Sequence, residues 1–147
     1  MMQRLSVRGW EIDHDRVATW EAYQRSGPTG PEKCGCLYCR NFVAARAVAY
    51  PPALRELSVK LGLESPRESE TWEYGPEPGQ DRLYGGFFHI IGSLVKAAES
   101  TDGEPFLFSP RKDFLPAGFP RDPILQVEFH FRVPWVLQEA PTDVATT

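Results

Sequence analysis

The segment LQVEFHFRV, residues 125–133, constrains the fold more than any other part of the chain. Apolar side chains occupy every second position, and polar side chains occupy the positions between them. This period of two predicts a β-strand with one face on an apolar core and the other in contact with water or a ligand. One-sided burial is typical of antiparallel sheets, so we expect a mainly antiparallel sheet.

Further strands are expected upstream of this segment. LYGGFFHIIGSLV, residues 83–95, is apolar on both faces and predicts a long buried strand, and TWEYG, residues 71–75, predicts a short one. The pair Asp102-Gly103 favours a turn leading into FLF, residues 106–108. Residues 109–123 contain four prolines, which exclude an interior strand and predict a loop.

Two consecutive short helices precede these strands. RNFVAARAVAY, residues 40–50, is rich in alanine and is stopped by Pro51. ALRELSVKLG, residues 53–62, follows Pro52 and has a leucine stripe. We therefore predict an α+β fold, with a mainly antiparallel sheet and the two helices packed on one face. Residues 1–138 are expected to form a single domain, and residues 139–147 a flexible tail.

The N-terminal segment LSVRGWEIDHDRVATWEAY allows two interpretations. In the first, the polar cluster DHDR, residues 13–16, turns a hairpin whose second strand contains Thr19, Trp20 and Tyr23. In the second, Asp15 caps a helix. Thr19, Trp20 and Tyr23 are residue types that suit the pleated surface of a sheet, which favours the hairpin.

Composition and charge narrow the class of protein. The 41% hydrophobic and 12% aromatic content indicates a folded chain. No run of 18 apolar residues and no signal peptide is present, so we expect a cytoplasmic protein that is not inserted in a membrane. Residues 61–104 carry a net charge of −6, which argues against binding of nucleic acid.

All three cysteines lie within six positions, at Cys34, Cys36 and Cys39. The C-x-C-x-x-C spacing lets three sulfurs converge if the chain bends at Gly35, and zinc accepts three thiolates and a fourth donor. The fourth donor would be a histidine, a carboxylate or water, and the candidate histidines are His89 and His130, with His14 in an expected turn as a third option.

Two other interpretations of the cysteines stay open. Cys36 and Cys39 could form a redox pair at the start of a helix, where the macrodipole favours a thiolate, although no strand is expected directly before them. Alternatively, all three are plain thiols that pack a tight corner.

Two segments are candidate binding surfaces. The proline-stiffened loop DFLPAGFP, residues 113–120, presents Phe114 and Phe119, which either contact a partner or fold back onto the core. On the polar face of the last strand, Glu128, His130 and Arg132 form a row that is either a hydrogen-bonding face or simply wetted by solvent.

Five segments, CGCLYCRNF, LGLESP, TWEYG, YGGFFHIIG and VPWVL, occur in this order between about residues 34 and 137. Together they resemble a group of short bacterial proteins of uncharacterised function, which pair a C-x-C-x-x-C-x-N motif with a later Gly-aromatic-His strand. The resemblance implies no activity. It implies that one framework contains these seven residues: Cys34, Cys36, Cys39, Asn41, Gly86, His89 and Trp135.

The sequence favours a binding function over catalysis. It contains no G-x-S-x-G elbow, H-E-x-x-H pair or nucleotide-binding fingerprint. Our first hypothesis is a non-catalytic protein that binds a protein partner and has a cysteine corner able to hold structural zinc. The alternative is a metal- or thiol-dependent enzyme that uses the cysteines with a histidine.

Overall fold

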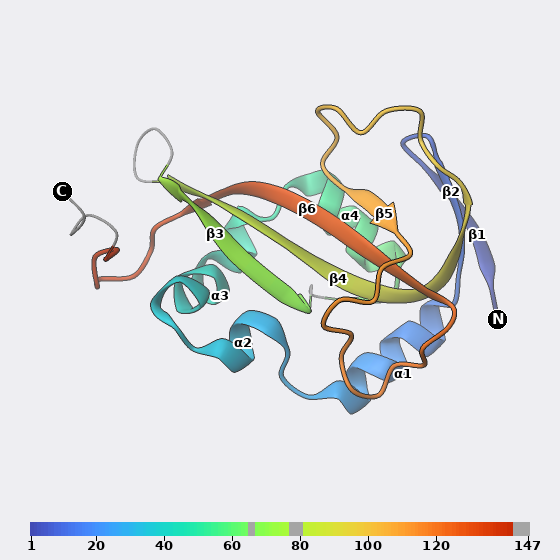
Figure 1. Cartoon of the computed structure of the whole chain (residues 1–147), viewed down its shortest axis with the longest axis horizontal. Helices are drawn as coiled ribbons and strands as arrows, with labels where there is room; N and C mark the ends of the chain where they lie inside the picture. Colours follow the sequence, from blue (N-terminus) through green and yellow to red (C-terminus); the bar gives the residue numbers. More distant parts are fainter. Residues whose placement is uncertain (65–66, 77–80, 143–147) are drawn as a thin grey trace.

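The long strand β4 (Asp81–Lys96) is the centre of the sheet in the computed structural model, which describes residues 1–64, 67–76 and 81–142. One edge of β4 pairs with β6 (Ile124–Pro134), which continues to β5 (Leu107–Ser109). The other edge pairs first with β3 (Glu70–Pro76) and then with β2 (Trp10–His14), which pairs with β1 (Gln3–Val7). Every pairing is antiparallel (Figure 1).

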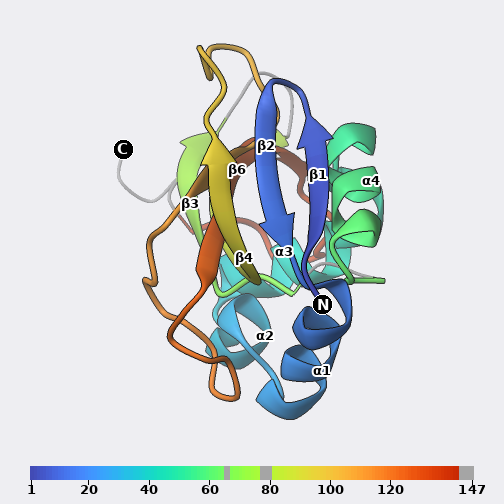
Figure 2. The ribbon, with the colours of Figure 1, turned by 90° about the vertical axis from the view of Figure 1, so that its right-hand side faces the viewer.

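The helices of the described chain precede β3. They are α1 (Arg16–Ser26), α2 (Gly30–Cys34), α3 (Leu37–Ala49) and α4 (Pro52–Lys60). Apolar side chains of α3 and α4, including Phe42 and Leu57, share one core cluster with Phe88 of β4 and Phe129 of β6. The predicted α+β class is therefore confirmed. Figure 2 shows α4 beside the β1–β2 hairpin.

The alternation in β6 is also observed, with one difference. Its five predicted inward side chains, at positions 125, 127, 129, 131 and 133, are buried. Gln126, on the opposite face, is buried as well, although the pattern placed it in contact with water or a ligand. Its amide oxygen bonds the ring of His89, so this end of the outer face carries a buried polar contact.

The preferred interpretation of the N-terminus is wrong in part. A hairpin exists, but its turn is formed by Arg8 and Gly9, both with positive φ, and DHDR does not form it. Asp15 instead caps α1, where its carboxylate accepts a hydrogen bond from the backbone N–H of Ala18 at 2.9 Å. The helix buries Thr19, whose hydroxyl donates to the Asp15 carbonyl. Because this buried residue is polar, the inward face of α1 did not show as an apolar stripe in the sequence.

Candidate functional site

The three cysteines lie at the corner between α2 and α3. Cys34 is the last residue of α2, and Gly35 turns the chain in the left-handed region with φ of 71°. Cys36 then occupies the N-cap position of α3, and Cys39 follows in the first helical turn. Their Sγ atoms all lie within 4.8 Å of one another. We name this group, Cys34, Cys36 and Cys39, the cysteine cluster.

The three thiols differ in exposure and in acidity. Cys34 and Cys36 are exposed, whereas Cys39 is buried. Burial opposes ionisation of Cys36, but hydrogen bonds from the Cys39 backbone and from the neighbouring thiols lower its pKa below the ordinary value. Burial, and then the thiols of Cys36 and Cys34, raise the pKa of Cys39. In the cluster without a cation, ionisation of one thiol makes ionisation of its neighbour less favourable. A cation shared by the three sulfurs would remove this competition, because a coordinating thiol is deprotonated.

The corner is fixed to the end of β6 by polar contacts of α3. The side-chain amide of Asn41 donates to the carbonyl of Pro134 at 3.1 Å and accepts from the N–H of Val136 at 2.8 Å. The hydroxyl of Tyr84 on β4 donates to the Tyr38 carbonyl at 2.7 Å. These contacts hold the first turn of α3, and with it Cys39, in a fixed place against the sheet.

The tail beyond residue 138 has contacts where the structure describes it. Arg40 forms an ion pair with Glu139 at 2.8 Å, and the Trp135 indole donates to the Glu139 carbonyl at 2.8 Å. The remainder of the predicted flexible tail, residues 143–147, lies outside the described residues.

The structure does not bring the candidate histidines to the cysteine cluster. Among the described residues, no histidine, aspartate or glutamate joins the three cysteines. His130 is exposed on β6. His14 is buried at the end of β2. His89 is fully buried, and both of its ring nitrogens have hydrogen-bond partners on the protein. The cluster therefore offers three sulfur donors, and its fourth donor is not supplied by any of these rings.

His89 lies in a side-chain network that the sequence did not reveal. Its Nδ1 is 2.7 Å from the hydroxyl of Ser69, which precedes β3, and its Nε2 is 3.1 Å from the amide oxygen of Gln126. Burial lowers the pKa of His89 to about 4, against the hydrogen bond to Gln126, which raises it. Ser69 lies 20 positions away in a polar stretch, so no local motif marked the pair.

The candidate binding residues separate into different environments. Phe114 is 69% exposed and has a positive φ of 52°, and its ring stacks on Phe87 of the outer sheet face. Phe119 instead packs edge-on against Tyr23 of α1, with ring centroids 4.7 Å apart. Phe114 is therefore available at the surface for contact with a partner, whereas Phe119 folds back onto the core.

The polar row on β6 lies beside aromatic side chains that the sequence analysis had not linked to it. His130 and Arg132 are exposed and Glu128 is half-buried. Glu128 and His130 line a hollow together with Trp72 and Tyr74 of β3. The Trp72 indole lies across Gly85, where an added Cβ would be 2.6 Å from its Nε1 atom. Cross-strand pairing of β3, β4 and β6 brings these residues together.

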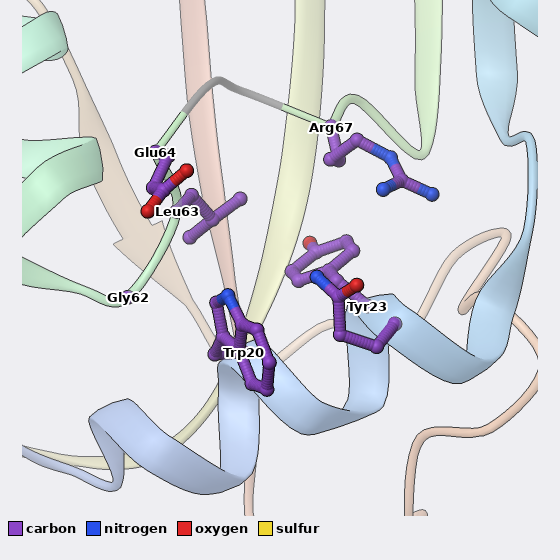
Figure 3. Close-up of a pocket in the computed structure, with 7 residues that line it drawn as sticks. Trp20, Tyr23, Gly62, Leu63, Glu64 and Arg67 are labelled. Atoms are coloured by element: carbon purple, nitrogen blue, oxygen red, sulfur yellow. The ribbon is translucent and has the colours of Figure 1, made fainter.

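A second hollow lies between α1 and the segment that follows α4 (Figure 3). The guanidinium of Arg67 lies 5.7 Å from the centre of the Tyr23 ring and donates to the Gly27 carbonyl at 2.5 Å. The exposed Trp20 forms the opposite wall (Figure 3). Among the residues that the structure describes, the lining of this hollow contains no serine, cysteine or histidine.

Comparisons with protein-family models, with curated proteins and with solved structures find no match to this chain. In the described part of the chain, no helix combines the length and apolar character needed to cross a membrane. The chemistry of the molecule therefore has to be inferred from its own side chains.

Proposed function

We propose that the protein binds one zinc ion through Cys34, Cys36 and Cys39, and that this ion is structural. The observation that supports it is the convergence of three sulfurs to within 4.8 Å at the Gly35 bend. Sulfurs bound to one tetrahedral zinc lie roughly 3.8 Å apart, given zinc–sulfur bonds of about 2.3 Å. A small contraction of the cluster would therefore complete three of the four coordination positions.

A structural role fits the position of the donors. They come from the end of α2 and the start of α3, so a shared ion would clamp two helices that are otherwise joined by a short turn. Because a metal that binds only the folded state stabilises it by mass action, zinc at 100 times its dissociation constant would contribute about 2.7 kcal/mol. Water would complete the coordination of the ion, so the structural role rests on the position of the donors between two helices and not on a closed ligand set.

The test is the metal content of the purified protein after exhaustive dialysis. We expect one equivalent of zinc in the parent protein and its loss from Cys39→Ser, with circular dichroism confirming that the variant remains folded. His130→Ala and His89→Gln are the matched controls, and both should retain zinc because neither ring lies in the cluster. Zinc that persists in Cys39→Ser, or a parent protein that never holds zinc, would contradict the proposal.

The exposure of Phe114 supports a second proposal, contact with a partner protein through the outer sheet face. An aromatic ring held 69% exposed on a proline-containing loop loses little conformational entropy when it is covered. A photo-crosslinking amino acid at position 114 should give a discrete crosslinked product in cells, whereas the same group at the core-facing position 119 should not. Equal crosslinking from both positions, or none from 114, would argue against this surface.

A further inference from the structure

Three features that are distant in sequence border one surface groove. The groove lies between the residues around α2, the segment that begins β3, and the loop that contains Phe114. Its lining includes Cys34 of the cysteine cluster, Lys33, Ser69 and Phe114. We call it the Ser69 groove. Ser69, which is only 6% exposed, thus lines the groove and is also a hydrogen-bond partner of the fully buried His89.

The hydrogen bonds of His89 determine which ring nitrogen holds the proton. The Gln126 amide oxygen at 3.1 Å can only accept, so Nε2 carries the hydrogen. Nδ1 is then an acceptor, and the Ser69 hydroxyl at 2.7 Å donates to it. Nucleophile, base and orienting group are therefore arranged in the order that activates a serine.

Hydrogen bonds fix the backbone of both His89, on β4, and Ser69, which directly precedes β3. The Tyr23 hydroxyl donates to the His89 carbonyl at 2.5 Å and accepts from the His89 N–H at 3.0 Å. The N–H of Ser69 donates to the Phe87 carbonyl at 2.8 Å. Burial lowers the pKa of His89 to about 4, so its ring is neutral near pH 7 but is a weaker base than an exposed imidazole, and the transfer relies on its 2.7 Å contact with the Ser69 hydroxyl.

We propose that the Ser69 groove is an acyl-transfer site, with Ser69 as nucleophile, His89 as general base and Gln126 as the residue that positions the ring. The substrate class is a carboxylic ester with a small apolar acyl group, because Phe114, Pro116 and Ala117 supply apolar lining. The charged residues of the lining are Lys33 and Glu70, and of these Lys33 is the one suited to an oxygen that becomes negative during the reaction.

The reaction balances with water as the second substrate. As the Ser69 Oγ bonds to the ester carbonyl carbon, its proton passes to His89 Nδ1. The alkoxide leaves with that proton as an alcohol, and the acyl group remains on Ser69. Water then gives a proton to Nδ1 while its oxygen attacks the acyl carbon. A carboxylic acid is released, and the proton returns from Nδ1 to the Ser69 oxygen.

The test is covalent labelling of the intact protein with an alkyl fluorophosphonate, followed by peptide mapping. This probe phosphonylates an activated serine with loss of fluoride, and it avoids the acylation of exposed cysteines that complicates assays with activated esters. We expect one adduct per chain on Ser69 and its loss in Ser69→Ala. Ser26→Ala is the matched control, because Ser26 lines the same groove and donates to the Tyr23 carbonyl.

A folded parent protein with no adduct, or with its adduct on a residue other than Ser69, would overturn the proposal. Labelling should also persist in Cys39→Ser, which separates this site from the zinc proposal, since either one can fail alone. Loss of labelling in a folded Cys39→Ser variant would mean that the reactivity belongs to the cysteine cluster, and it would refute the assignment to the Ser69–His89 pair.

The positioning role of Gln126 has its own measurement. Gln126→Met removes the acceptor at Nε2 and should lower the labelling rate at Ser69 at least tenfold. Gln126→Glu restores an acceptor oxygen and should restore the rate. A purely structural Gln126 would give the opposite order, because burying a carboxylate costs more than burying a thioether. Thermal unfolding of each variant monitors that structural effect separately.

Discussion

Replacing Glu68 by glutamine should destabilise the protein through a single buried ion pair. The Glu68 side chain is fully buried, and its carboxylate accepts from Arg46 at 2.6 and 3.2 Å and from the Tyr50 hydroxyl at 2.6 Å. The substitution removes the negative charge and places an amide N–H₂ against one of these donors. Breaking a buried pair from one side typically costs about 3–5 kcal/mol.

The structure places the expected loss at the lower end of that range. Arg46 keeps a second carboxylate partner, Glu32, at 3.0 Å, and its own side chain is 15% exposed. We therefore expect Glu68→Gln to lower the free energy of unfolding by about 3 kcal/mol. For a chain of this length that corresponds to a decrease in Tm of roughly 6–12 °C. Urea titration at pH 7, followed by circular dichroism, measures the free energy directly.

Glu104→Gln is the control because it breaks a pair of the same length in a different environment. Glu104 lies 2.6 Å from Arg8, but these side chains are 28% and 44% exposed. Exposed pairs contribute at most about 1 kcal/mol. Similar losses in the two variants would refute the reasoning that burial, and not distance, sets the strength of the Glu68 pair.

Two further predictions concern the sheet. Burial lowers the pKa of His89 from 6.5 to about 4, so His89 is protonated in the unfolded chain before it is protonated in the folded chain as the pH falls. The free energy of unfolding should therefore decrease by about 3 kcal/mol between pH 6.5 and pH 4. Urea titrations across this range should show a smaller decrease in His89→Gln, with a residual slope from the buried His14, and an unchanged slope would contradict the assignment. Gly85→Val should displace the Trp72 indole, because an added Cβ would overlap it, and should lower stability by about 1–3 kcal/mol. Tryptophan emission should shift to longer wavelength. An emission spectrum identical to that of the parent protein would show that the position of the indole does not depend on Gly85.

Local patterns predicted the regular elements wherever one face was uniformly apolar. The period of two in β6 and the leucine stripe of α4 specified both elements, because a strand or helix with one apolar face has one way to bury it. The same reasoning failed at α1. There the buried face contains Thr19, which satisfies its hydroxyl within the helix and accepts a hydrogen bond from the Ile91 N–H. A polar side chain with tertiary partners cannot be told from a solvated one by pattern alone.

The cysteine cluster could be predicted because all of its donors lie on one short bend, where Gly35 permits a left-handed turn. The sequence by itself thus determined the sheet class, the paired helices and the convergence of three sulfurs. Only the tertiary structure decided that His89 bonds Ser69 and Gln126 and lies outside the cluster. Those contacts join β4 to residues 20 and 37 positions away, and strand pairing across the sheet, not local spacing, brings them within hydrogen-bonding distance.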